Sequence, residues 1–433
     1  MESKTYSHSL AGKTFLVELN NWAEQASGSV LVRLGDTVVL ATAVMAKNQR
    51  EGGDFFPLTV DYEERFYAAG KILGSRFIKR ETRPSEEAIL VDRLIDRSIR
   101  PRFDLRIRNE VQIVVTALSI DDQNDPDIVA LLASSLALSL SDIPWQGPVA
   151  GVRVGRTDGK YILNPLYEER AKTDLDLIVS GTGERINMIE AGANEISEED
   201  FASAVEWGYE FVKELVAFQE KIIKERARPK ISVKLVEPPQ ELKNLIKKEF
   251  STKIEEAIYT SVKKEMRAKE AAVKEEWLKR AKEILPETFD KSSAEFLFDE
   301  EINQILHRRI IEKGERPDGR KTDEIRELSA SVALLPRVHG SGLFMRGETH
   351  ALATLTLGAP GDQQIVEGME VRTKKSFLLH YNFPPYSTGE TKPMRGPGRR
   401  EIGHGALAAK ALMPLLPSKD EFPYTMRIVS EIL

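Results

Sequence analysis

Residues 28–42 read GSVLVRLGDTVVLAT, and residues 340–354 read GSGLFMRGETHALAT. At a constant offset of 312 positions, eight of the fifteen residues are identical in the two segments. Each segment reads as a strand, a Gly-Asp or Gly-Glu turn and a second strand, which is the pattern of a β-hairpin. The chain therefore carries an internal repeat.

The similarity continues downstream of each hairpin. At an offset of 319, a polar-Tyr pair, a tyrosine and a glycine recur: Asp61-Tyr62, Tyr67 and Gly70 correspond to His380-Tyr381, Tyr386 and Gly389. Lys79-Arg80-Glu81 then matches Arg399-Arg400-Glu401 at an offset of 320. Three matches in one order predict two copies of one unit, with basic segments at equivalent places.

Strands and helices alternate around the first hairpin. Ser85 as N-cap and Pro101 as a stop predict a helix between them. Further along we expect strands over 111–118 and 174–181 and helices over 127–141 and 198–225. This mixture predicts an α/β (α+β) fold.

The middle of the chain has a different pattern. Residues 240–285 are rich in Lys, Glu and Ala and almost lack turn residues, which predicts an inserted all-helical segment ending near Gly314. We therefore predict three domains: a first core over 1–228, a helical segment over 229–313 and part of a second core over 314–433.

Composition excludes several classes of protein. The 433 residues include no cysteine, so disulfides and cysteine-ligated metals are excluded. No apolar run approaches the roughly 20 residues of a membrane span, and a cytoplasmic location is expected. The net charge is −6, but residues 71–108 hold eleven Lys/Arg against six Asp/Glu, and residues 372–410 hold eight against two. Such islands indicate focused anion binding, or else solvated faces.

Two segments of these islands suit nucleic acid. In Phe77-Ile78-Lys79-Arg80, cations stand beside an aromatic ring that could stack on a base; the alternative is an exposed turn with Phe77 in the core. In residues 399–405, two arginines, a histidine and nearby glycines could surround one anion. The alternative there is a Gly-rich turn whose arginines pair with carboxylates.

Three weaker signals complete the set. Arg93, Arg97 and Arg100 share one face of the helix before Pro101. Arg320, in the turn RPDGR at 316–320, could meet a phosphate or simply pair with Asp318. Asp174 and Asp176 share one side of a strand, an arrangement that sometimes holds a divalent metal but is usually only solvated.

Taken together, the motifs resemble the polynucleotide phosphorylase family. RPDGR at 316–320, HYNFPPYSTGE at 380–390, RREIGHGALA at 400–409 and FPYTMRIVSE at 422–431 are similar to its second RNase PH-type core. DYEERFYAAGK at 61–71, FIKRETRPSE at 77–86 and RLIDRSIRP at 93–101 are similar to its first core. The resemblance covers essentially the whole chain.

The resemblance implies duplicated RNase PH-like cores, of the ribosomal protein S5 domain 2-like type, joined by an all-helical segment. It implies a homotrimeric ring that acts on single-stranded RNA 3′ ends, as a partner in RNA-degradation complexes. The implied reaction is 3′-to-5′ phosphorolysis, in which inorganic phosphate releases nucleoside diphosphates with Mg²⁺ as cofactor. The implied catalytic residues are Arg399, Arg400 and His404. The implied RNA contacts are Phe77, Lys79, Arg80, Arg83, Arg93, Arg97, Arg320 and Arg372.

The sequence departs from the family in one respect. The family's Ser-rich phosphate loop and acidic metal ligands follow the VSE motif, so they are expected beyond Leu433, and residues 1–433 are expected to form an incomplete site without metal ligands. At the equivalent place the first copy has Asn124-Asp125-Pro126-Asp127, which would repel phosphate. Two alternatives stay open: a catalytically inactive RNA-binding ring scaffold, and an exosome-type subunit, whose chains usually carry one core.

Overall fold

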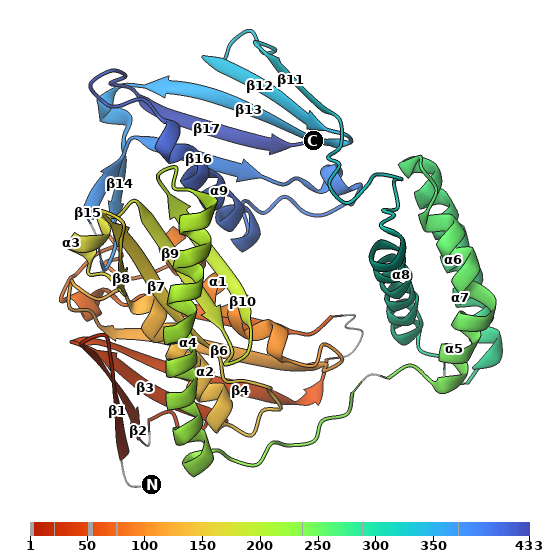
Figure 1. Ribbon diagram of the computed structural model, residues 1–433, viewed down its shortest axis with the longest axis horizontal. Coiled ribbons are helices and arrows are strands. Elements are labelled where there is room, and N and C mark those ends of the chain that lie inside the picture. Colours follow the sequence, from red (N-terminus) through yellow and green to blue (C-terminus); the bar gives the residue numbers. More distant parts are fainter. Residues whose placement is uncertain are drawn as a thin grey trace.

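The computed structural model describes residues 4–20, 22–50, 55–74, 77–235, 237–287, 289–370 and 372–433. It has three parts (Figure 1): a unit built from the first copy, a unit built from the second copy beside it, and a helical unit that stands to one side. The mixture of sheets and helices confirms the predicted α/β (α+β) class.

The first copy begins with a six-stranded sheet in the order β1-β2-β3-β4-β6-β5. The expected hairpin is formed by β3 and β4, while β5 runs parallel to β6. The strands are β1 (Lys4–Leu10), β2 (Lys13–Leu19), β3 (Gly28–Leu34), β4 (Thr37–Gln49), β5 (Leu58–Glu63) and β6 (Asn109–Ser119). The predicted strand at 111–118 is therefore confirmed within β6.

Helix α2 (Pro126–Leu140) lies at the centre of the first copy. The Asp125 carboxylate caps it by accepting the backbone N–H of Asp127 at 3.1 Å, and Pro126 suits its first turn. Every residue of α2 is buried, because it packs against β3 and β4 on one side and β7 on another. An apolar surface all round fits a helix in the middle of a core.

A second sheet, in the order β10-β9-β7-β8, lies on the other side of α2. Helix α4 (Glu198–Arg226) packs on β7 and β9, and Ser197 caps its start by accepting the N–H of Asp200 at 3.1 Å. The other elements of this part are β7 (Ala150–Thr157), β8 (Lys160–Leu163), α3 (Tyr167–Arg170), β9 (Leu175–Gly181) and β10 (Ile186–Ala193).

The helical unit has a hydrophobic core of its own. Trp277 is fully buried in it against Phe250 and donates its ring N–H to the carbonyl of Ala294 at 2.9 Å. The last helix ends at Gly314, whose left-handed conformation (φ 66°) closes it. The helices are α5 (Gln240–Leu245), continued by a π turn over Ile246–Phe250, α6 (Ser251–Ile258), α7 (Lys263–Ile284) and α8 (Lys291–Lys313). The predicted helical insertion is confirmed.

The second copy repeats the strand order of the first. Its sheet runs β11-β12-β13-β17-β16, matching β2-β3-β4-β6-β5, with β16 parallel to β17. The hairpin register is also the same, since Arg346 faces Thr349 as Leu34 faces Thr37. Its elements are β11 (Leu328–Val332), β12 (Gly340–Arg346), β13 (Thr349–Gly358), β14 (Gln364–Glu367), β15 (Arg372–Lys375), β16 (Phe377–Asn382), α9 (Arg399–Leu412) and β17 (Thr425–Ile432).

The equivalence of the two basic segments is wrong. The offset of 319 holds as far as Gly70 and Gly389, which both close a short turn in the left-handed conformation. Fifteen residues then precede α1 (Glu86–Ile99), but only nine precede α9. The helices are therefore offset by 313. Lys79-Arg80 belongs to a longer loop of the first copy, and Glu86-Glu87 occupies the place of Arg399-Arg400.

The close packing of α2 on the first hairpin gives a stability prediction. A Cβ atom at Gly28 would lie 2.2 Å from the carbonyl oxygen of Ala137 in α2, whereas at Gly340, the repeat equivalent, it would lie 3.4 Å from the Leu355 side chain. We expect Gly28→Ala to lower the free energy of unfolding by about 1–3 kcal/mol, because helix backbone cannot move aside easily.

Gly340→Ala is the matched control and should change that free energy by less than about 0.5 kcal/mol. The measurement is urea unfolding of both variants, followed by far-ultraviolet circular dichroism, which reports the strands and helices of both copies. Equal losses at the two positions would contradict the packing argument.

Candidate functional site

The two copies meet where α1 packs against α9 (Figure 1). The contact is close at Gly403, where a Cβ atom would lie 2.1 Å from Nε of Arg93. A glycine at this point of α9 lets the half-buried Arg93 side chain of α1 cross the helix. Residues from both copies therefore line one site.

Four predicted residues gather at this junction: Arg93 and Arg97 from α1, with Arg400 and His404 from α9. We name them the arginine cluster. Burial lowers the pKa of the His404 ring below its ordinary value, and the nearby charges of Arg400, Arg93 and Arg97 lower it further. Burial, Arg97 and Arg400 likewise lower the pKa of Arg93. The cluster therefore combines three cations with a histidine that stays largely uncharged at neutral pH.

Aromatic rings stand beside the arginine cluster. The Arg400 guanidinium lies 4.9 Å from the centre of the Phe383 ring, and His404 meets Tyr381 edge to face at 5.2 Å. A cleft of about 630 Å³ opens here, lined by the loop of residues 382–397 and by Arg400. Cations next to aromatic rings in an open cleft suit a single-stranded polyanion with flat bases. The sequence reasoning did not single out these two rings.

Arg399 does not join the arginine cluster. Its guanidinium donates to the carbonyl of Val60 and to Asp61, and lies 3.2 Å from the Asp92 carboxylate, all in the first copy. The residues 399–405 form the first turns of a helix and not a Gly-rich turn. Arg399 therefore pairs with carboxylates, which is the alternative interpretation given for this segment.

The loop with Phe77 is a second, separate candidate. Phe77 is 91% exposed, so the interpretation that places its ring in the core is wrong. Lys79, Arg80 and Arg83 are exposed as well. The loop is held at its base, where the Glu81 carboxylate accepts the backbone N–H of Phe66 at 2.7 Å. It presents a ring and three cations to solvent.

The other two arginines lie elsewhere. Arg320 is ion-paired with Asp318 at 2.8 Å in the turn that joins the helical unit to the second copy. Arg372 lies on β15, is 82% exposed at its side chain and pairs with Glu367 at 3.0 Å. Neither belongs to the arginine cluster.

The place in the first copy that is equivalent to the arginine cluster contains several ion pairs. Buried Arg153 contacts Asp127 and Asp125 at the start of α2 and Asp176 on β9. Burial raises the pKa of Asp127 to about 7, and Arg153 offsets this only in part. With Glu87 in place of Arg400, this site presents carboxylates where the second copy presents cations. The expectation that this place repels phosphate stays a prediction.

A hairpin of the second copy reaches into the first. The loop between β14 and β15 buries Met369 completely in the core of the first copy, and Lys71 donates to its carbonyl at 2.8 Å. Tyr167 donates to the neighbouring Glu370 at 2.8 Å. Burial, with Asp125 and Glu87 nearby, raises the pKa of Glu370 well above its ordinary value. The sequence reasoning missed this contact, because its partners lie about 200–300 residues apart.

The acidic residues Asp174 and Asp176 lie beside arginines in the described ranges. Over these ranges, no group of three or more His, Asp or Glu side chains is arranged to hold a metal ion. Asp174 pairs with Arg156 at 2.8 Å, and Asp176 pairs with Arg153 and Arg170. These two carboxylates are neutralised by arginines and do not fit a cation.

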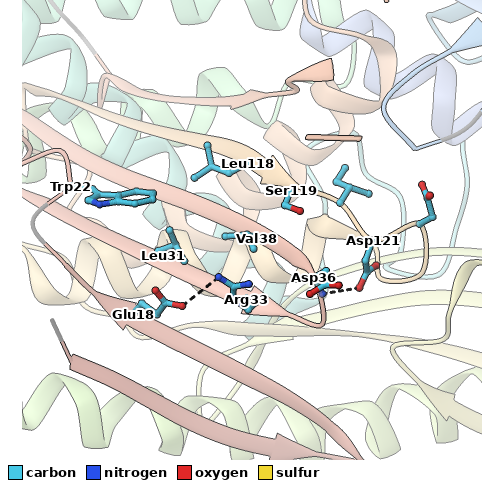
Figure 2. Close-up of a pocket in the computed structure, with 11 residues that line it drawn as sticks. Glu18, Trp22, Leu31, Arg33, Asp36, Val38, Leu118, Ser119 and Asp121 are labelled. Carbon is cyan, nitrogen blue, oxygen red and sulfur yellow. Dashed lines mark hydrogen bonds and ion pairs between the residues drawn. The ribbon is translucent and has the colours of Figure 1, made fainter. Parts of the chain in front are cut away.

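A hollow of about 760 Å³ lies on the outer face of the first sheet (Figure 2). Trp22, Leu31 and Val38 form one part of it, while Asp36 and Asp121 lie at the other end. None of the predicted RNA contacts lines it. Its acidic end would repel phosphate, so we do not place the functional site there.

Family models match most of the chain. The 3′ exoribonuclease family, domain 1, matches residues 12–144 and again 324–433, and domain 2 of that family matches residues 147–210. The RNA binding domain of polyribonucleotide nucleotidyltransferase matches residues 241–321. These matches coincide with the two cores and with the helical unit between them.

Curated relatives extend over the same range. Polyribonucleotide nucleotidyltransferases of Heliobacterium modesticaldum and Geobacillus kaustophilus are each 50% identical, over 99% and 100% of this chain. The chain spans 60% of the length of both. Among solved structures, rice Rrp46 covers 51% of this chain and 94% of its own, at 16% identity and a TM-score of 0.39. With two domain 1 matches flanking the helical unit, the chain belongs to the 3′ exoribonuclease family.

Proposed function

We propose that the protein containing these residues is a polyribonucleotide nucleotidyltransferase that degrades RNA from its 3′ end by phosphorolysis. The observation that carries the proposal is the arginine cluster, built from both copies beside the aromatic cleft. The names of the curated relatives support it.

In this reaction an oxygen of inorganic phosphate bonds to the phosphorus of the last phosphodiester. The bond from that phosphorus to the 3′ oxygen of the preceding nucleotide breaks, and this oxygen gains a proton. The products are a nucleoside diphosphate and a shortened RNA. Phosphoryl transfer of this kind depends on positioning and on neutralising charge more than on covalent help from protein.

The arginine cluster supplies both requirements. Arg93, Arg97 and Arg400 stabilise negative charge that accumulates between the attacking phosphate and the RNA phosphate. His404, kept uncharged by its cationic neighbours, donates its ring N–H to a phosphate oxygen without adding another positive charge. Mg²⁺ belongs to the proposal as charge neutralisation, and the described residues contain no cluster of three or more carboxylate or histidine side chains that would hold it.

The partners follow from the same proposal. We infer a single-stranded RNA 3′ end guided by the exposed loop of Phe77, Lys79, Arg80 and Arg83, with Arg320 and Arg372 as outer contacts. We further propose a homotrimer in the cytoplasm that takes part in an RNA-degradation complex. Over the described helices, none combines the length and the apolar surface needed to cross a membrane.

The direct test uses the gene product that contains these 433 residues. Incubated with poly(A), it should release ADP only when inorganic phosphate is present, and ADP should be incorporated into RNA in the reverse direction. The measurement is chromatography of labelled products. RNA binding without phosphate-dependent release would favour the inactive ring scaffold instead.

Loop cations give a second prediction. Lys79→Ala with Arg80→Ala should weaken binding of single-stranded RNA and reduce the slope of log affinity against log salt by about 1.4, since each lost contact removes roughly 0.7. Lys160→Ala, which removes an exposed cation on β8, is the control and should leave the slope unchanged. Fluorescence anisotropy at several salt concentrations measures both. An unchanged slope in the double variant would remove the loop from the RNA path.

Packing at Gly403 gives a third prediction. Gly403→Ala should displace the Arg93 guanidinium and lower kcat/KM for RNA several-fold, about 1 kcal/mol in transition-state stabilisation. Gly405→Ala lies on the same helix and places its Cβ at an ordinary 3.4 Å from the Leu379 carbonyl, so it controls for helix propensity. Equal kinetics in the two variants would show that Arg93 is not needed at this position.

A further inference from the structure

Two neighbouring arginines at the start of α9 have opposite surroundings. The N–H groups of the Arg399 guanidinium contact Val60, Asp61 and Asp92 of the first copy. Within the described ranges, Arg400 makes no ion pair or side-chain hydrogen bond and stands over the Phe383 ring. Arg400 therefore keeps its donors for a ligand, whereas those of Arg399 are engaged.

Arg399 faces the carboxylate of Asp92, which lies where an unpaired negative charge would be costly. Asp92 is 2% exposed, and one of its oxygens accepts the backbone N–H of Tyr62. Its other oxygen has no hydrogen bond and faces the Arg399 guanidinium at 3.2 Å. A buried carboxylate without a partner is costly, so Arg399 and Asp92 depend on each other.

The groups around Asp92 determine how this dependence varies with pH. Burial raises the pKa of Asp92 to about 7, Arg399 opposes that rise, and the carboxylates Asp61 and Glu63 on β5 add to it. On α1 itself, Asp96 lies near Arg399. Removing Arg399 would therefore raise the pKa of Asp92 further.

We propose that Arg399 is a positioning residue, which fastens the first turn of α9 to Asp61 and Asp92 of the first copy and so aims Arg400 and His404 at the RNA. The inference rests on the proposed function, because it assigns different roles to two residues of that site. It predicts that the first copy contributes to the reaction through an internal ion pair, although its own site is filled with carboxylates.

The test is a double-mutant cycle of Arg399→Gln and Asp92→Asn in the complete gene product. With Arg399→Gln alone, kcat/KM for RNA should fall about tenfold at pH 8. The loss should shrink toward pH 6, because Asp92, with a pKa of about 7, is then protonated in the wild type and the ion pair is already weakened. Asp92→Asn alone should cause part of this loss, and adding it to Arg399→Gln should cost little more, because both changes break the same ion pair.

Arg400→Gln is the matched control on the adjacent residue. Its loss should be the same at both pH values and should add to the loss caused by Asp92→Asn. If Arg399 touches RNA or phosphate directly, Arg399→Gln will behave like this control, with a raised KM for phosphate and a loss that adds to that of Asp92→Asn. That result would overturn the inference.

A readout independent of activity separates the inference from the proposed function. Hydrogen exchange at the backbone amides of residues 399–405 should become faster in Arg399→Gln, with little further change when Asp92→Asn is added. If wild-type protein shows no phosphorolysis, the proposed function fails, yet this exchange pattern still tests the ion pair. Unchanged exchange in Arg399→Gln would contradict the positioning role even in an active enzyme.

Discussion

The two-copy arrangement depends on the close packing of α1 against α9. A glycine at position 403 allows Arg93 to cross α9, and the ion pairs of Arg399 hold the start of that helix against the first copy. Both contacts join residues that are about 300 positions apart in the sequence. Because of them, cations from one copy and a histidine from the other share one site.

The two copies share one arrangement of strands but differ in the charges at the start of their equivalent helices. Strand order and hairpin register agree in both. At the start of the equivalent helices, however, the first copy has Glu86-Glu87 and the second has Arg399-Arg400. The first copy therefore has carboxylates at the start of its helix, while Arg400 of the second copy joins Arg93 and Arg97 of the first in the arginine cluster. The arrangement of strands is thus shared, although the residues at the starts of the equivalent helices differ in charge.

The sequence predicted the framework better than the site. The hairpins, the helix capped by Ser85 and the helical insertion follow from local periodicity and capping, and the structure confirms them. The equivalence of Lys79-Arg80 with Arg399-Arg400 failed, because a short basic match cannot reveal a difference in loop length. The pairing of Arg399 with Asp61 and Asp92, and the burial of Met369, depend on tertiary contacts that leave no local pattern.

The buried loop between β14 and β15 also bears on how the chain folds. Met369 enters a core made entirely of first-copy residues, and Lys71 fastens it there. Domains near the N-terminus form first during synthesis. The first copy can thus be folded before residue 369 leaves the ribosome. Its core is then ready to bind Met369 of the second copy. The folded first copy then provides the surface that orients the second copy as it folds.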